Sequence, residues 1–353
     1  MKDWAYSFIP LILGFIFQFA WIFKIKLDTQ FFIAILAFLT TTIGFTSVGY
    51  LTNEYFDRES DLLSGKKNYL ADLSITKVSF LFILAIITTL APWLILRLSY
   101  ISIVLVSVEL SLFLIYSLPQ TRFKNVTYLS NIIDTLYAYL IPVALTYRTF
   151  FFYAPINVEF DILYLYLILF FFVGFRNILI HHIVDATHDN IGQIKTLALK
   201  WGVEKAKSRI KIILILEFIA GLVLLKFIIS SYYILIFLIA IYAWTFFKTY
   251  QDKKEKPYQN KFVIDQFYQI YLPVVILFLL ASQQSAWYPI LFIFYFLFAR
   301  ELNSKIYYYL KSVKNKLSII VNYAIYYIFL MFRVDLKKEN SSAWQYIKKK
   351  LKL

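Results

Sequence analysis

Long runs of apolar residues, each ended by a short polar segment, make up most of the chain. About 20 helical residues cross the roughly 30 Å of hydrocarbon in a bilayer, whereas the strands of a membrane barrel alternate over about ten residues. The runs here are continuous, so the pattern predicts an all-α polytopic membrane protein. The expected spans number about nine and cover residues 5–23, 30–52, 77–96, 99–118, 128–148, 161–184, 209–229, 231–247 and 263–282.

The C-terminal region departs from this regular pattern. Apolar stretches at 286–299 and 318–332 precede a basic tail that contains Lys348, Lys349, Lys350 and Lys352. If both stretches spanned, the tail would lie outside, against the tendency of basic residues to stay in the cytoplasm. We therefore expect part of this region to lie along the inner membrane surface, near anionic head groups. The sequence predicts a transmembrane domain over 1–285 and an extension of one or more hydrophobic helices and a basic tail over 286–353.

Composition agrees with the membrane interpretation. Hydrophobic residues make up 61% of the chain and charged residues 16%, against about 45–50% and about 25% in soluble domains. The segment "SFIPLILGFIFQFAWIF" is too long for a signal-peptide core and lacks a small-residue cleavage site, so it reads as the first span. The absence of cysteine excludes disulfides and thiolate catalysis.

The formal net charge of +15 could indicate a nucleic-acid partner, but in a membrane protein it more commonly marks cytoplasmic loops. Basic residues concentrate in the connections near 53–76, 119–127, 185–208 and 248–262, while the opposite connections hold few. This alternation predicts a multi-pass protein of the cell (inner) membrane with its N-terminus inside, and no nucleic-acid partner.

Two acidic clusters end apolar runs on this predicted cytoplasmic side. Asn53, Asp57 and Asp61 are spaced four apart, as are Asp185 and Asp189, and a spacing of four keeps side chains on nearly one face of a helix. Two facing pairs of carboxylates repel unless cations lie between them. Mg²⁺ typically binds through one or two carboxylates plus substrate phosphates. We therefore predict a Mg²⁺ site formed by all five residues, with the four aspartates as catalytic residues.

Basic side chains on the same side suggest what the metal would hold. Together with the acids and Mg²⁺, they suit a diphosphate-bearing lipid at a membrane face, and we expect substrate contacts from Arg58, Lys66, Lys67, Arg122, Lys124 and Lys195. The alternative is that the acids are ordinary solvated residues at helix ends. Two clusters on the same side favour this alternative less than a single cluster would.

Three segments resemble the UbiA superfamily of intramembrane prenyltransferases. "NEYFDRESD" fits its Asn-x-x-x-Asp-x-x-x-Asp signature, "DATHDNIGQIKTLALKWG" resembles its second acidic signature, and "YSLPQTRFK" looks like the segment between them. The resemblance covers roughly residues 1–285. It implies nine helices around a central cavity, Mg²⁺ at both acidic motifs, and a polyprenyl diphosphate held by the metal.

The resemblance also implies a reaction and further contacts. Mg²⁺ and basic groups would stabilise departing pyrophosphate, an allylic carbocation would form away from water, and an acceptor would capture it. The acceptor would be a small aromatic such as a 4-hydroxybenzoate-like acid, or a prenylated glycerol phosphate. Asn53 would bind substrate as well as metal, Arg122 and Lys124 would contact diphosphate or acceptor, and Tyr116 would lie near the cavity. Where many members carry an Arg-Pro-Leu/Ile run, this chain reads "SGKKNYL", and Lys lacks the bidentate fork of Arg.

Ionisable residues inside spans are functional candidates. Asp134 follows the "YSLPQTRFK" segment and is the candidate for an acceptor contact. His181, one helical turn before Asp185, reads either as a proton acceptor or partner of the acidic site, or as a packing residue. For His182, Glu109 and Glu217 we favour packing or lateral contacts.

Two rival functions differ in what they require. A transporter would place its charges near the bilayer midplane and show paired broken helices, whereas the acids here lie at span ends. An intramembrane terpene cyclase would keep the fold and the metal chemistry but capture the cation within its own chain, and the sequence leaves this alternative open.

Overall fold

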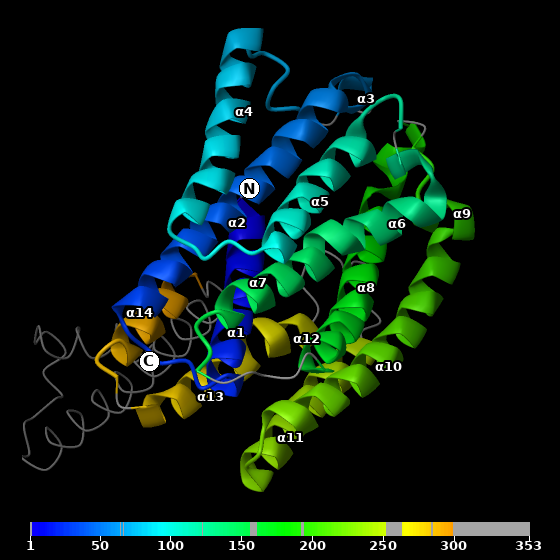
Figure 1. Cartoon of the computed structure of the whole chain (residues 1–353). Coiled ribbons are helices and arrows are strands. Elements are labelled where there is room, and N and C mark those ends of the chain that lie inside the picture. Colours follow the sequence, from blue (N-terminus) through cyan, green and yellow to red (C-terminus); the bar gives the residue numbers. More distant parts are fainter. Residues whose placement is uncertain are drawn as a thin grey trace, which may run out of the picture. The chain divides into compact units, whose positions relative to one another are not determined.

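The computed structural model describes residues 2–63, 65, 67–121, 123–155, 161–191, 194–251, 263–283 and 285–298, and every regular element in these ranges is helical (Figure 1). In chain order the elements are α1 (Lys2–Ile22), α2 (Thr29–Phe56), α3 (Arg58–Leu63), α4 (Ile75–Leu90), η1 (Ala91–Leu94), α5 (Tyr100–Ser117), η2 (Phe123–Asn125), α6 (Thr127–Thr135), η3 (Leu136–Leu140), α7 (Ile141–Phe151), α8 (Asp161–Ile191), α9 (Leu197–Trp201), α10 (Val203–Ile228), α11 (Tyr232–Tyr250), α12 (Val263–Gln266), η4 (Phe267–Tyr271), α13 (Leu272–Leu280), η5 (Ala281–Gln283) and α14 (Tyr288–Phe298).

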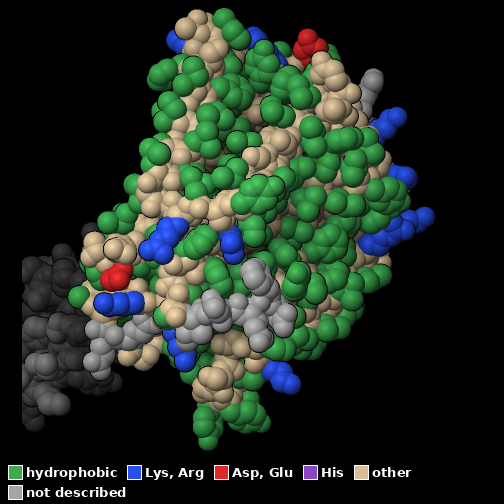
Figure 2. All heavy atoms as spheres, in the orientation of Figure 1, with side chains coloured by type: hydrophobic (Ala, Val, Ile, Leu, Met, Phe, Trp, Pro, Cys, Tyr) green, Lys and Arg blue, Asp and Glu red, His purple; other side chains and the backbone are tan. Residues whose placement is uncertain are grey.

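The surface of the molecule is that of a membrane protein. Hydrophobic side chains cover most of the face in Figure 2, and large apolar residues such as Phe80, Phe227 and Phe237 are exposed on α4, α10 and α11. In the described residues, 7 helices or helix runs are long and apolar enough to cross a membrane. The predicted class, a helical polytopic membrane protein, is confirmed. The expected count of nine spans is not, because α1 has a shorter apolar stretch, Phe8–Ile22, and α10 is not among the 7.

Polar residues at the starts of apolar runs fix where two spans begin. Asp28 caps α2, its Oδ1 accepting from the backbone N–H of Phe31 at 3.0 Å. Ser99 caps α5, its Oγ accepting from the N–H of Ser102 at 3.0 Å. Such caps satisfy backbone donors that a helix start leaves without an intrahelical partner.

Two spans contain a widened turn, and proline accounts for both. The π-helical segments η3 and η4 end two residues before Pro142 and Pro273 respectively. Proline has no N–H for the carbonyl four residues earlier and its ring clashes with that carbonyl, so the preceding turn opens to the wider π spacing. In η3 this turn carries Tyr137 and Tyr139, both of which contact polar residues of neighbouring elements.

Glycine allows neighbouring helices to approach closely. A Cβ atom on Gly44 of α2 would lie 2.4 Å from the backbone nitrogen of Thr89 in α4. Thr41, one turn earlier, donates a hydrogen bond from its hydroxyl to the carbonyl of Thr89 at 3.1 Å. Small residues and hydroxyl groups are the usual means of packing helices within a membrane, and here they fix α4 against α2.

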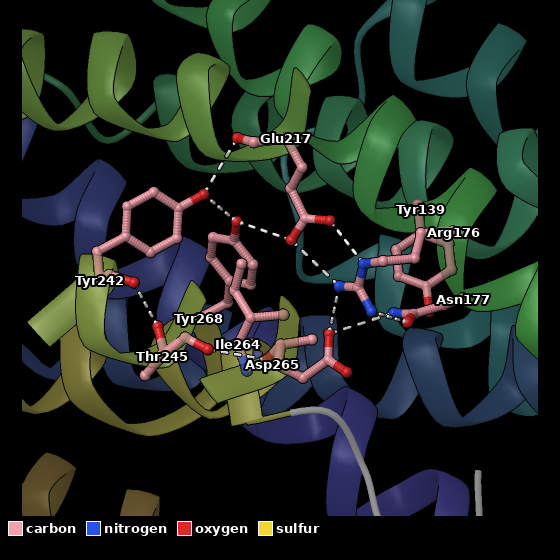
Figure 3. A network of polar contacts seen from close by, with 10 residues as sticks. Tyr139, Arg176, Asn177, Glu217, Tyr242, Thr245, Ile264, Asp265 and Tyr268 are labelled. Atoms are coloured by element: carbon pink, nitrogen blue, oxygen red, sulfur yellow. Dashed lines mark hydrogen bonds and ion pairs between the residues drawn. The ribbon is translucent and has the colours of Figure 1, made fainter. Parts of the chain in front are cut away.

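A buried polar network holds α8 in place (Figure 3). The guanidinium of Arg176, which is 0% exposed, binds Glu217 of α10 at 2.6 Å and Asp265 of α12 at 2.8 Å. The neighbouring Asn177 donates to the hydroxyl of Tyr139 in η3 at 3.1 Å. Because charges in a membrane interior are costly unless paired, these contacts fix α8 to three other elements.

The chain divides into two compact units, residues 1–298 and 299–353. In the first, α14 packs against α1 through the rings of Phe17 and Tyr295, 5.8 Å apart, and the hydroxyl of Tyr295 donates to the carbonyl of Gln269 in η4. The second unit, with the predicted stretch at 318–332 and the basic tail, lies outside the described residues.

Candidate functional site

The first acidic motif lies across a break between two helices. α2 ends at Phe56, Asp57 takes φ −94° and ψ 1°, and its N–H still donates to the carbonyl of Asn53. Asp61 then belongs to the short helix α3. The spacing predicted one continuous helical face; instead Asp57 occupies the bridge region of backbone space, which active-site residues often adopt. Asp57 is 5% exposed, whereas Asn53 is exposed on α2.

Lys124 connects this motif to the segment between the two motifs. Its Nζ lies 2.5 Å from Oδ2 of Asp57, and both side chains are buried. Lys124 belongs to η2, which precedes α6. A buried carboxylate and ammonium compensate each other's loss of hydration only when they are paired, so this contact fixes η2 over the end of α2.

The second motif lies on one helix, as its spacing predicts. Asp185 and Asp189 are on α8, whose 31 residues extend about 46 Å, further than the roughly 30 Å of hydrocarbon. Nε2 of His181 lies 3.9 Å from Oδ2 of Asp185, which supports the interpretation of His181 as a partner of the acidic site. Asp189 is buried at the end of the helix, and its carbonyl accepts from the N–H of Ile194.

Contacts near the end of α5 connect the elements that carry the two motifs. Asp57 pairs with Lys124 of η2, the segment that precedes α6. Asp134 of α6 lies 3.8 Å from His182 of α8, the helix that carries the second motif. In Figure 1, α3, which contains Asp61 of the first motif, and α9, which follows the second motif, lie at the same end of the first unit. The helices that carry the two motifs therefore end in the same part of the first unit, and the side of the membrane that they face stays a prediction.

Asp134 is the centre of the polar contacts at this end. Tyr116 donates to its Oδ2 at 2.7 Å and Tyr137 donates to its Oδ1. Nε2 of His182 lies 3.8 Å from its Oδ2. Asp134 thus lies within the candidate site, and His182, which we expected only to pack, faces it.

A cavity of about 250 Å³ opens beside these residues. Asn53, Tyr116 and His181 line it at the end that carries the motifs. The remainder is mostly apolar, with side chains such as Phe38 and Leu145, but it includes Glu109. The lining residues of α2 run from Phe38 to Asn53, about 22 Å along the helix. An apolar cavity with a few polar groups at one end suits an amphiphilic ligand.

Some predicted substrate contacts are directed elsewhere. Arg58 donates to the carbonyl of Ala71, and the Lys67 ammonium lies 4.8 Å from the ring centre of Tyr69. Lys195 is exposed between α8 and α9. The other predicted residues of these loops, Lys66 and Arg122, lie outside the described part of the chain.

The donor set fits Mg²⁺ only together with a substrate. In the described ranges no group of three or more His, Asp and Glu side chains comes close enough to hold a metal ion. The available donors are carboxylate oxygens from α8 and from the α2–α3 junction, the ligand type that Mg²⁺ prefers. Because Mg²⁺ commonly uses one or two carboxylates and completes its shell with phosphates and water, the two motifs fit ions that bridge protein and diphosphate.

Sequence reasoning missed the residues that order the loop after the first motif. Asn68 is buried, and its Nδ2 donates to Oδ2 of Asp61 at 3.0 Å and to the carbonyl of Glu54 at 2.7 Å. The carboxylate of Glu54 accepts from the N–H of Tyr69 at 2.7 Å. The one available signal was an asparagine inside "SGKKNYL", where we expected only the lysines to matter.

Comparison with known proteins identifies relatives of this architecture. A family model described as the UbiA prenyltransferase family matches residues 7–271, and no curated protein matches the chain. A UbiA homolog from Archaeoglobus fulgidus bound to GPP and Mg²⁺ is similar in structure, with a TM-score of 0.58 at 16% identity over 80% of this chain and 96% of that one. The apo structure of a UbiA homolog from Aeropyrum pernix K1 has a TM-score of 0.55 at 12% identity, over 76% of this chain and 94% of that one. A digeranylgeranylglyceryl phosphate synthase has a TM-score of 0.50 at 14% identity, over 80% of this chain and 98% of that one.

Proposed function

Because the chain belongs to the UbiA prenyltransferase family, we propose that it transfers a polyprenyl group from a polyprenyl diphosphate to an acceptor and releases pyrophosphate, with Mg²⁺ as its cofactor. The observation that carries the proposal is a set of contacts at one end of a largely apolar cavity. Tyr116, which lines the cavity, donates to Asp134, and Asp134 also faces His182 of the helix with the second motif. Lys124, from the segment before Asp134, pairs with Asp57 of the first motif. A diphosphate would lie at this end and the prenyl chain along the cavity.

The two acidic motifs would hold the metal. Asp57 and Asp61 on one side, and Asp185 and Asp189 on the other, offer carboxylate oxygens, and Asn53 is exposed beside them. Bound Mg²⁺ would neutralise the charge that develops on pyrophosphate as it departs. Two similar structures of a UbiA homolog from A. fulgidus are bound to GPP or DMAPP together with Mg²⁺, which supports this assignment.

The chain's own residues supply the remaining chemistry. The bond between C1 of the donor and its diphosphate oxygen breaks, and the electron pair leaves with pyrophosphate. Lys124, 2.5 Å from Asp57, is placed to donate to a diphosphate oxygen. The apolar lining excludes water from the allylic cation, and rings such as Phe113 and Tyr137 in the lining stabilise positive charge through their π faces. The acceptor then bonds to C1 and loses a proton.

Two acceptor classes suit this site: a small aromatic such as a 4-hydroxybenzoate-like acid, and a prenylated glycerol phosphate. The similarity to a digeranylgeranylglyceryl phosphate synthase supports the second without excluding the first. We place the mouth of the cavity on the cytoplasmic side of the cell (inner) membrane, since the connections at the end with the motifs carry more basic residues than the opposite connections.

Pyrophosphate release by the purified full-length chain in detergent tests the function. Geranyl, farnesyl and geranylgeranyl diphosphates are supplied with Mg²⁺, with and without 4-hydroxybenzoate and geranylgeranylglyceryl phosphate as acceptors. Release that depends on an acceptor is the expected result. Release without any acceptor, with formation of a cyclic hydrocarbon, would identify a terpene cyclase instead, and no release in any combination would contradict both.

A further inference from the structure

A carboxyl group that belongs to neither acidic motif lines the cavity. Glu109 of α5 is 3% exposed and lines the cavity. In the part of the chain that the structure describes, its Oε2 atom has no hydrogen-bond partner. Neither the metal site nor the diphosphate contacts proposed above use this residue.

The position of Glu109 is set by the helix that carries it. The buried residues of α5 include Ser102, Val106, Glu109, Phe113 and Ser117, a stripe at intervals of three and four that forms one helical face. Glu109 lies seven residues before Tyr116 on that helix, about 10 Å deeper along the axis. It is therefore too deep to share the diphosphate end with Asp57.

The surroundings of Glu109 leave its carboxyl group to an incoming ligand. The cavity lining includes Phe113, four residues after Glu109 on α5, and Ala138 of η3, and both side chains are apolar. The hydroxyl of Tyr137, which also lines the cavity, donates to Asp134, and the ammonium of Lys124 binds Asp57. A buried polar atom without a partner costs free energy, and a ligand that donates a hydrogen bond removes that cost.

We propose that Glu109 binds the acceptor by accepting a hydrogen bond from its hydroxyl or amine group. This inference rests on the proposed prenyl transfer and narrows its acceptor class: the end of the acceptor that enters the cavity is a hydrogen-bond donor, and any carboxylate or phosphate it carries stays toward the mouth, away from Glu109. A phenol and a glycerol hydroxyl both meet this requirement. Their methyl ethers do not.

The test compares acceptor and donor kinetics in the full-length protein. The variants are Glu109→Gln, which keeps the shape of the side chain, Glu109→Leu, which removes its polar atoms, and the control Ser111→Ala on the exposed side of α5. The donor is geranylgeranyl diphosphate with Mg²⁺. The probes are 4-hydroxybenzoate, its methyl ether and geranylgeranylglyceryl phosphate.

We expect the wild type to use a hydroxyl probe and not the methyl ether. Glu109→Leu should raise KM for that acceptor about tenfold, the effect of losing one hydrogen bond in a buried site, with Glu109→Gln between it and the wild type. KM for the donor and the Ser111→Ala control should stay within about twofold.

Three results would overturn the proposal. One is an unchanged acceptor KM in Glu109→Leu, and another is equal use of hydroxyl probe and methyl ether. The third is a wild-type protein that binds donor with Mg²⁺ but turns it over with none of the acceptors, because Glu109 would then have no acceptor to bind. Absence of Mg²⁺-dependent donor binding, by contrast, would contradict the proposed function itself.

Discussion

At the scale of single residues, the site depends on Lys124. This residue pairs with Asp57 at 2.5 Å and is buried, so it joins the first acidic motif to the segment between the motifs. A lysine paired with a metal-binding carboxylate can transfer its hydrogen bonds to the diphosphate when substrate and cation arrive. Its role is then to balance the charge of the leaving group.

Lys124→Met should lower kcat/KM for the prenyl diphosphate about 10²–10³-fold, the effect of removing one preorganised donor to developing negative charge. Lys124→Arg should retain more activity because it keeps the charge. Lys205→Met, an exposed lysine of α10, is the matched control and should behave as wild type. Pyrophosphate release under Mg²⁺ measures all three, and equal activity of Lys124→Met and Lys205→Met would contradict the role of Lys124.

Residue types and spacing predicted part of this site. Acids that directly follow an apolar run or lie inside one are conspicuous, so the two motifs and Asp134 could be read from the sequence. The partner of a side chain could not be read, because it depends on how separate helices meet. Glu109 looked like a packing residue and Lys67 like a phosphate contact. In the structure Glu109 lines the cavity and Lys67 lies over Tyr69.

At the scale of elements, the Arg176 network fixes the position of α8 and thereby of the second motif. Arg176, Glu217 and Asp265 come from α8, α10 and α12, and Asp185 lies nine residues beyond Arg176 on the same helix. The sequence showed that Arg176, Glu217 and Asp265 lie inside spans, but it did not show that they contact one another. The same holds for the π turns: Pro142 and Pro273 were visible, but which residues the widened turns would reorient was not.

Arg176→Gln should destabilise the protein by about 3–5 kcal/mol, since it leaves buried carboxylates without their cation. The thermal unfolding midpoint in detergent is the measurement. Arg209→Gln, an exposed arginine that stacks 3.8 Å from the ring centre of Trp201, should cost no more than about 1 kcal/mol. Adding Glu217→Gln to Arg176→Gln should recover part of the loss, and equal midpoints for the two arginine variants would contradict the account.

At the scale of the whole molecule, the apolar periodicity predicted the class and most of the spans. The runs at 30–52, 99–118 and 231–247 correspond to α2, α5 and α11, and the family match confirms a prenyltransferase of the UbiA family. Helix ends were less predictable because polar residues extend a helix beyond the membrane: α8 reaches Ile191 where we expected 184. The proposed catalytic domain of residues 1–285 leaves the C-terminal extension without an assigned role.

The orientation can be tested because the chain contains no cysteine. Single substitutions Lys67→Cys and Lys195→Cys, at exposed positions beside the two motifs, should react with a membrane-impermeant maleimide only from the cytoplasmic side. Arg97→Cys, in the connection between α4 and α5, should react only from the opposite side. Labelling of Lys67→Cys and Lys195→Cys from different sides would contradict a shared site for the two motifs.

The central claim is that the two acidic motifs bind one diphosphate through Mg²⁺, and calorimetric binding of geranyl diphosphate tests it most directly. The full-length protein is titrated with and without Mg²⁺, beside Asp57→Asn, Asp185→Asn and the control Glu204→Gln, an exposed acid of α10. We predict that removal of Mg²⁺ and each aspartate substitution weaken binding about tenfold or more, while the control binds as wild type. Binding that persists without Mg²⁺, or an Asp185→Asn variant with wild-type affinity, would contradict the claim.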